Sequence, residues 1–241
     1  MATGWVTQRI GTFYLDPETG IMATGMVEID GTLCNFDDEG HATGGWMTKE
    51  DGTRYYFKED GKAYQGWLKE GDKSYFINRG KMLTGWINLG GNKFYLGEDG
   101  VCRKYWQKIG EDWYYFYGSG SMATGWVTQR IGTFYLDPET GIMATGMKVI
   151  DGTRWFFDGD GRLADGWAED ETGRYYFEEG KPVTGWKDLD GFRYYFQEDG
   201  TMATGKVTID GQDYWFDQDG HLLTEEEQPE EPETPETSDE K

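Results

Sequence analysis

The stretch MATGWVTQRIGTFYLDPETGIMATGM occupies residues 1–26 and recurs letter for letter at residues 122–147. It contains a smaller unit: Gly-Trp, a polar turn, an aromatic arm, a Gly-containing turn and Met-Ala-Thr-Gly. Variants of this unit predict about eleven tandem repeats of about 20 residues. They begin at Gly4, Gly25, Gly45, Gly66, Gly85, Tyr105, Gly125, Gly146, Gly166, Gly185 and Gly205.

Each unit has the pattern of a β-hairpin. In residues 45–65, Trp46 begins a short first arm, Asp51-Gly52 supplies a turn signal, and residues 54–57 (RYYF) form a second arm rich in β-formers. One isolated hairpin is marginal in water, so the units must stack on one another to bury a shared core. The sequence therefore predicts an all-β solenoid of hairpin repeats over residues 1–224.

The alignment of the units assigns the two faces of the second arm. Its last position holds only Phe or Leu, so we expect it in the core, with Tyr55 on the same side and Arg54 and Tyr56 on the opposite side. The Met position of Met-Ala-Thr-Gly holds an apolar residue in every unit, which predicts packing between neighbouring units. The expected core positions are Leu15, Phe36, Phe57, Phe76, Leu96, Phe116, Leu136, Phe157, Phe177, Phe196 and Phe216.

The net charge is −22, and residues 225–241 supply a disproportionate share of it. That segment combines nine acidic residues with three prolines and has no apolar anchor, so we expect it to be a disordered, extended tail. An acidic surface repels phosphate backbones and anionic lipid, which argues against nucleic acid or a membrane surface as partner. No apolar run is long enough to insert into a bilayer.

The sequence offers no sign of catalysis or of a cofactor. Cys34 and Cys102 stand where other units carry apolar residues, so we expect both to be buried. With only His41 and His221 besides, we expect neither a His/Cys metal site nor a Ser-His catalytic pair. Because the chain begins inside a repeat, we expect it to be part of a longer protein with a catalytic or adhesive domain elsewhere.

Units such as residues 105–124 (YWQKIGEDWYYFYGSGSMAT) resemble the cell-wall-binding repeat family. This family includes choline-binding modules of Gram-positive surface proteins, glucan-binding repeats and clostridial toxin repeats. The resemblance covers residues 1–224 and implies a left-handed superhelix of hairpins. It also implies a secreted protein of the bacterial cell surface or cell wall.

In choline-binding members, the resemblance implies an aromatic cage for the quaternary ammonium between consecutive hairpins. Only unit six carries the complete set: Trp106 and Trp113 match the two tryptophans, Met122 lies at the join, and Trp126 and Tyr135 of the next unit complete it. A cation over aromatic faces gains roughly 0.5–2 kcal/mol per contact. We therefore expect an ammonium site there.

The other units replace the second tryptophan by Arg, Lys, Thr, Leu or Asp, which resembles the glucan-type and toxin-type repeats. Their Gly-Trp tryptophans either line sites or simply pack against the next hairpin. The further candidates are Trp46, Tyr56, Trp67, Trp86, Tyr95, Trp167, Tyr176, Trp186 and Tyr195.

These features predict a non-catalytic, multivalent attachment module. It would bind a repetitive surface polymer, either choline-bearing teichoic acid or a glucan-type polysaccharide. The alternative is a structural stalk or adhesin spacer whose aromatic residues only hold the array together.

Overall fold

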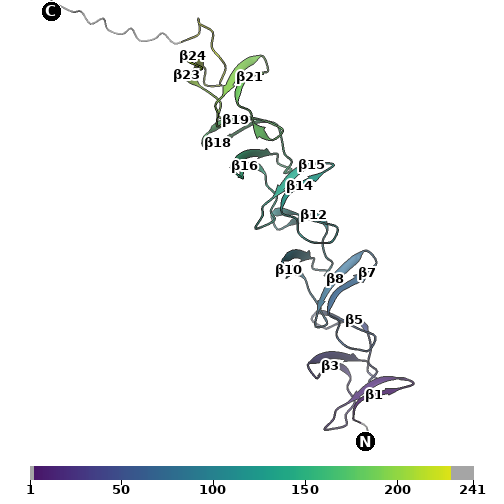
Figure 1. Cartoon of the computed structure of the whole chain (residues 1–241). Helices are drawn as coiled ribbons and strands as arrows, with labels where there is room; N and C mark the ends of the chain where they lie inside the picture. Colours follow the sequence, from purple (N-terminus) through teal and green to yellow (C-terminus); the bar gives the residue numbers. More distant parts are fainter. Residues whose placement is uncertain (1–2, 229–241) are drawn as a thin grey trace, which may run out of the picture. The chain divides into compact units, whose positions relative to one another are not determined.

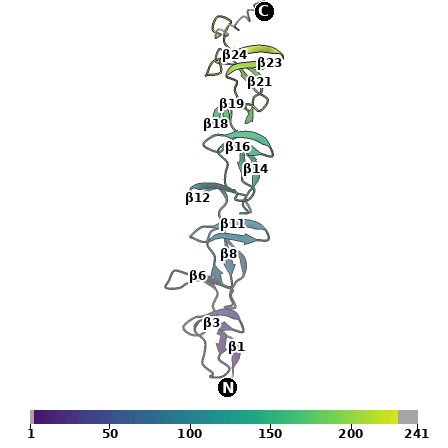
Figure 2. The same cartoon turned by 90° about the vertical axis from the view of Figure 1, so that its left-hand side faces the viewer.

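The computed structural model describes residues 3–228, and their regular secondary structure consists of β-strands (Figure 1). None of these residues belongs to a helix long and apolar enough to span a bilayer. The chain divides into two compact halves, residues 1–123 and residues 124–241. Within each half, hairpins follow one another along the chain, as Figure 2 shows from a second side. The predicted all-β repeat fold is confirmed. Most of the predicted tail, residues 229–241, lies outside the described residues.

The N-terminal half holds repeats one to six, and each forms an antiparallel hairpin. Repeats three and four join through β9 into a five-stranded sheet of order β5-β6-β9-β8-β7. The strands are β1 (Gly4–Gln8), β2 (Gly11–Leu15), β3 (Gly25–Ile29), β4 (Thr32–Phe36), β5 (Gly45–Thr48), β6 (Arg54–Phe57), β7 (Gly66–Glu70), β8 (Lys73–Asn78), β9 (Lys81–Met82), β10 (Gly85–Leu89), β11 (Asn92–Leu96), β12 (Tyr105–Ile109) and β13 (Asp112–Phe116).

The C-terminal half holds repeats seven to eleven, again as antiparallel hairpins. In repeat nine, β20 adds a third strand to the β18-β19 pair. The strands are β14 (Gly125–Gln129), β15 (Gly132–Leu136), β16 (Gly146–Ile150), β17 (Thr153–Phe157), β18 (Gly166–Asp170), β19 (Gly173–Glu178), β20 (Lys181–Pro182), β21 (Gly185–Leu189), β22 (Phe192–Phe196), β23 (Gly205–Ile209) and β24 (Gln212–Phe216).

Asp-Gly turns connect the two strands of several hairpins. At Asp190-Gly191 both residues have positive φ, 51° and 88°, which is the conformation of a two-residue type I′ turn. Asp51-Gly52 differs, because β5 and β6 pair only as far as Thr48 and Arg54 and the intervening loop is longer. In that loop only Gly52 has positive φ.

The core residue of the second strand is buried in most repeats. Phe57, Phe116 and Phe177 are at most 1% exposed, as the sequence predicts. The expectation for Phe76 is wrong: Gly66 pairs with Ile77, so Ile77 takes the core position and Phe76 turns to the opposite face beside Trp67. The reason is register, because a one-residue shift along a strand exchanges the two faces.

Within each half, backbone hydrogen bonds join several repeats to the one before. The N–H at the Met position donates to the carbonyl of the earlier repeat's second strand, as from Leu163 to Thr133 and from Met202 to Arg174, at 2.7 and 2.8 Å. Within its own repeat the Met position pairs with the core residue, as Met202 does with Phe196. These contacts support the predicted packing role of the Met position.

The two cysteines are buried and free of disulfide bonds, as expected. Cys34 is 0% and Cys102 4% exposed. Burial raises the pKa of each thiol. Both therefore act as small apolar core residues.

Candidate ligand-binding site

In the hairpins that carry a Gly-Trp tryptophan, it packs on the residue opposite it in the same hairpin. Trp186 pairs with Tyr195 in the register of β21 and β22, and their ring centroids lie 5.1 Å apart. Trp46 with Tyr56, Trp86 with Tyr95 and Trp167 with Tyr176 repeat this arrangement at 5.1–5.2 Å. The predicted outward tyrosines therefore lie on the tryptophan face, as the strand period requires, but they are half-buried rather than free.

The same tryptophan also contacts an aromatic ring of the next hairpin. Trp186 lies 4.9 Å from Tyr214, at an interplanar angle of 73°. We call this group an aromatic junction: the Gly-Trp indole, the ring opposite it, and the ring two positions before the next core residue. The third rings, which the sequence reasoning did not select, are Tyr75, Phe94, Tyr114, Trp155, Tyr194 and Tyr214.

Packing leaves part of many junction tryptophans open to solvent. Trp67, Trp86, Trp126 and Trp186 are 38–43% exposed. An indole that bridges two hairpins and still presents this much surface provides both cohesion and an aromatic face for a ligand. The two roles weighed from the sequence, packing and ligand binding, are thus compatible.

The predicted cage of repeat six divides between the two halves. Trp106, Trp113 and Met122 belong to the N-terminal half, and Trp126 and Tyr135 to the C-terminal half. In its half, Trp106 packs on Tyr115 with ring centroids 5.1 Å apart and an interplanar angle of 55°, and Trp113 is 42% exposed. Met122 is half-buried and pairs with Phe116.

On the other side of that division, Trp126 contacts Tyr135 of its own repeat and Trp155 of repeat eight, at 5.1 and 4.8 Å. Both of these contacts lie within the C-terminal half. The five-residue cage therefore stays a prediction.

Lys181 lies over Trp155 of the Trp126 junction, with its Nζ 5.2 Å from the ring centroid, and arginines stand over the Gly-Trp indole at two further junctions. The Arg54 guanidinium lies 4.1 Å from the Trp46 ring centroid, and that of Arg174 lies 4.9 Å from Trp167. Both arginines occupy the strand position at which repeat six has Trp113. The indole N–H of Trp46 also donates to Glu70 at 3.0 Å. These two tryptophans are less exposed than Trp86 or Trp186.

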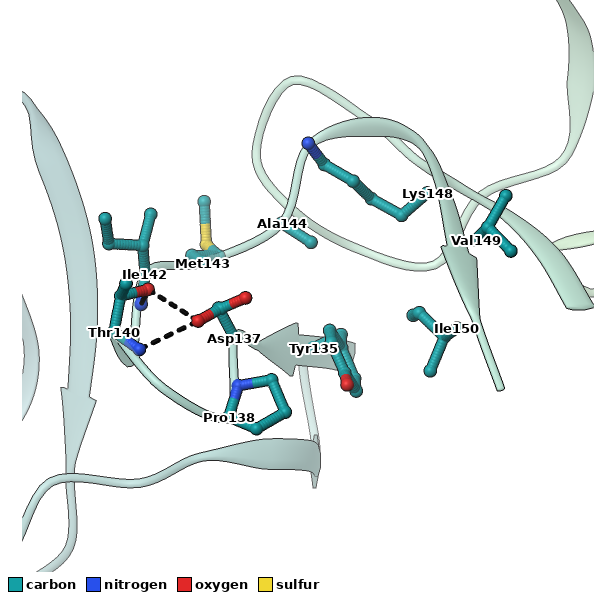
Figure 3. A pocket seen from close by; sticks show the side chains of 10 residues that line it. All are labelled: Tyr135, Asp137, Pro138, Thr140, Ile142, Met143, Ala144, Lys148, Val149 and Ile150. Atoms are coloured by element: carbon teal, nitrogen blue, oxygen red, sulfur yellow. Dashed lines mark hydrogen bonds between the residues drawn. The ribbon is translucent and has the colours of Figure 1, made fainter. Parts of the chain in front are cut away.

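The duplicated 26-residue block, together with the strand that it leads into, lines a groove that is separate from the junctions. In the second copy it has a volume of about 360 Å³ and includes Tyr135, Asp137, Thr140, Lys148 and Ile150 (Figure 3). Asp137 Oδ1 accepts hydrogen bonds from the Thr140 N–H and hydroxyl, both at 2.8 Å. These bonds lower the pKa of Asp137, so its carboxylate is ionised near neutral pH.

The first copy has an equivalent groove of about 270 Å³, which includes Tyr14, Asp16 and Thr19. Val27 stands there in place of Lys148. The loop after each aromatic arm, with the sequence DPETGI, is longer than the corresponding loop of most repeats and forms one wall of each groove.

The two histidines form hydrogen bonds with aspartates in turns. His41 and His221 each bind a turn aspartate, Asp37 and Asp217, and each packs on a phenylalanine ring, at 4.8 and 3.8 Å between centroids. Asp37, Glu39 and His41 offer three potential metal ligands within 4.8 Å of one another. The backbone N–H and the imidazole of His41 are both hydrogen-bonded to the Asp37 carboxylate, and these bonds stabilise the turn.

Comparison with known proteins agrees with the repeat pattern. A choline-binding repeat model matches residues 102–145 and 183–226, and a cell wall binding repeat model matches residues 45–63 and 84–102. Together these stretches cover just over half of the chain. No curated protein has a matching sequence.

Solved structures of pneumococcal proteins share the fold. CbpJ from Streptococcus pneumoniae TIGR4 matches with 26% identity and a TM-score of 0.70, over 92% of this chain and 94% of CbpJ. The choline-binding domain of CbpL from Streptococcus pneumoniae matches with 29% identity and a TM-score of 0.55, over 76% and 98%. Choline binding protein F of the same organism, at 23% identity and a TM-score of 0.56 over 93% and 99%, has the same fold.

The tandem hairpins, the recurring Gly-Trp junctions and the matched repeats lead to one assignment. The chain belongs to the cell-wall choline-binding repeat family and is a module of choline-binding repeats.

Proposed function

We propose that this chain is a non-catalytic, multivalent attachment module at the surface of a Gram-positive bacterium. It binds a repetitive cell-wall polymer that carries choline, through the aromatic junctions between consecutive hairpins. The observation that carries the proposal is the exposed indole at junctions such as that of Trp186, between Tyr195 and Tyr214. Its relative CbpL has a choline-binding domain of this fold.

The physics of the junction suits a quaternary ammonium group. Each aromatic face in contact with the cation contributes roughly 0.5–2 kcal/mol. Two or three faces therefore give a free energy near that of a millimolar site, for which about −4 kcal/mol is needed. The net charge of −22 favours a cationic ligand further.

Weak sites at a regular spacing suit attachment to a polymer. Once one choline unit is bound, the next lies at a high effective concentration, so affinity rises without any new contact. We infer a secreted protein in which this module, residues 1–224, anchors a catalytic or adhesive domain carried elsewhere in the parent chain. The structural stalk is the competing function, and it requires no ligand.

The test is a titration with choline that follows tryptophan fluorescence. Trp186→Leu should remove one of the proposed sites, and Trp106→Ala should remove the site predicted for repeat six. Trp215→Leu is the matched control, because Trp215 lies in repeat eleven beneath Lys206 rather than at a junction. Far-UV circular dichroism checks that each variant folds. A folded protein that responds to neither choline nor cell-wall oligosaccharide would establish the stalk instead.

The grooves of the duplicated block favour a second candidate, a glycan. The Tyr135 ring offers a stacking face, and the Asp137 carboxylate and Lys148 ammonium offer hydrogen bonds to hydroxyl groups, a combination that suits a sugar ring. Titration with glucan oligosaccharides should then change the fluorescence of Trp126, which packs on Tyr135. A fluorescence response that saturates with oligosaccharide, together with no response to choline, would identify a glycan as the ligand of the module.

A further inference from the structure

Repeats nine and ten form a matched pair of junctions. Trp167 contacts Tyr176 and Tyr194 at 5.2 and 5.1 Å, and Trp186 contacts Tyr195 and Tyr214 at 5.1 and 4.9 Å. Both junctions lie in the C-terminal half, and both repeats carry an arginine two positions before the tyrosine opposite the indole. The aromatic geometry is thus nearly the same at the two sites.

The arginines of the two repeats behave differently. Arg174 lies over the Trp167 ring, with its guanidinium carbon 4.9 Å from the centroid. Arg193 instead binds Asp188, with Nε to Oδ1 at 2.7 Å and Nη2 to Oδ2 at 3.0 Å. This bidentate pairing also lowers the pKa of Asp188, so the carboxylate remains charged near neutral pH.

The difference follows the residue opposite each arginine on the first strand. Asp188 stands opposite Arg193, whereas Glu169 stands opposite Arg174 and forms no ion pair with it in the described part of the chain. In repeat three the opposite residue is Thr48, which carries no charge, and Arg54 lies 4.1 Å over Trp46. An aspartate opposite the arginine therefore accompanies an uncovered ring.

Exposure agrees with this division. Trp186, whose arginine is held by Asp188, is 39% exposed. Trp46 and Trp167, whose arginines lie over the indole, are less exposed than Trp186. A guanidinium over the ring occupies the face that an ammonium ligand needs, and its positive charge opposes the approach of a second cation.

We propose that Arg54 and Arg174 act as intramolecular ligands that close the junctions of Trp46 and Trp167, and that Asp188 keeps the Trp186 junction open by holding Arg193. The inference rests on the proposed binding of an ammonium group at these junctions. It makes the residue opposite the arginine a specificity determinant: aspartate gives an open junction, and glutamate or threonine gives a closed one. The array therefore contains fewer binding sites than junctions.

The test resolves single tryptophans by their indole N–H resonances in ¹H–¹⁵N spectra, assigned by individual Trp→Phe substitutions, with choline chloride as the probe. Arg174→Thr copies the threonine that repeat seven has at this position, and should make Trp167 respond to choline as Trp186 does. Glu169→Asp should have the same effect by drawing Arg174 away from the ring. Asp188→Ala should release Arg193 onto Trp186 and weaken choline binding there about 2- to 30-fold.

Two variants complete the design. Arg193→Thr makes the same substitution as Arg174→Thr in the next repeat, and should leave the affinity at Trp186 within twofold of the original protein. Asp188→Ala combined with Arg193→Thr should restore the affinity that Asp188→Ala alone removes. Recovery in this double variant identifies Arg193, rather than a loss of folding, as the cause.

The outcomes separate this inference from the proposed function. If Trp167 of the original protein responds to choline as strongly as Trp186, or if Arg174→Thr leaves Trp167 unresponsive, the inference is overturned. If Trp186 of the original protein does not respond, the proposed function fails at that junction. A response gained at Trp167 in Arg174→Thr would support the closing role of Arg174 even then.

Discussion

Replacing Gly161 by alanine tests how consecutive repeats are joined. Gly161 lies in the second turn of repeat eight with φ +79°, and a Cβ atom there would overlap Met143 of repeat seven, 2.8 Å from its Cγ. The left-handed backbone costs an alanine roughly 1–2 kcal/mol. Moving Met143 away from its preferred rotamer costs about 0.5–1.5 kcal/mol more. We therefore expect Gly161→Ala to lower the free energy of unfolding by about 1.5–3.5 kcal/mol.

The same turn supplies a matched control. Gly159 lies two residues earlier, lacks a positive φ, and has no atom within 4 Å of the position of its missing Cβ. Gly159→Ala should change stability by less than about 0.5 kcal/mol. Urea titration followed by tryptophan fluorescence measures both variants. Equal midpoints for the two would refute the inter-repeat contact and the backbone strain together.

A double-mutant cycle separates the two contributions. Met143→Ala removes the side chain that the new Cβ would meet, so in its presence Gly161→Ala should keep only the backbone cost. The coupling energy between the two substitutions should then be about 0.5–1.5 kcal/mol. A coupling energy near zero would assign the whole effect to φ.

Three further predictions concern acid stability, thiol reactivity and the register of repeat four. Hydrogen bonds from Thr140 lower the pKa of Asp137 in the folded protein. The stability that this shift contributes is fully present above the unfolded pKa of about 3.9 and is lost as the pH falls through the folded pKa. Urea midpoints between pH 2 and 6 measure this loss. Buried Cys34 should react with a thiol reagent at neutral pH only after unfolding, whereas labelling of the native protein would contradict its burial. Ile77→Ala should cost about 2–5 kcal/mol and Phe76→Ala clearly less, and urea midpoints in the reverse order would restore Phe76 to the core.

The sequence predicts the repeat fold well because its main signals are local. Turn residues such as Asp190-Gly191 mark the hairpins, and strand alternation places Phe177 in the core. Repeat four misleads the alignment because the aromatic side chains at Tyr75 and Phe76 resemble the usual arm while the pairing of Gly66 with Ile77 shifts the register by one residue. Register depends on cross-strand pairing, which composition alone does not specify.

The candidate junctions were predictable only in part. The Gly-Trp tryptophans and the tyrosines opposite them follow from the hairpin period, as with Trp186 and Tyr195. Tyr214 is not among the predicted residues because strand alternation places its position, equivalent to that of Tyr55, on the core side, although its ring reaches the indole of the preceding hairpin. A ring two positions before each core residue is the sequence signal that identifies this third member.

The sequence by itself therefore determined the tandem hairpins, most of the buried second-strand positions and the tryptophan face, since each follows from residue type and the two-residue period of a strand. Tertiary structure alone decided which ring of the next hairpin meets each indole and which junctions an arginine covers. Arg174 and Arg193 occupy equivalent positions, yet one lies over a ring and the other binds a carboxylate. A flexible cationic side chain adopts whichever partner its surroundings place within reach, and that placement exists only once the hairpins are folded and stacked.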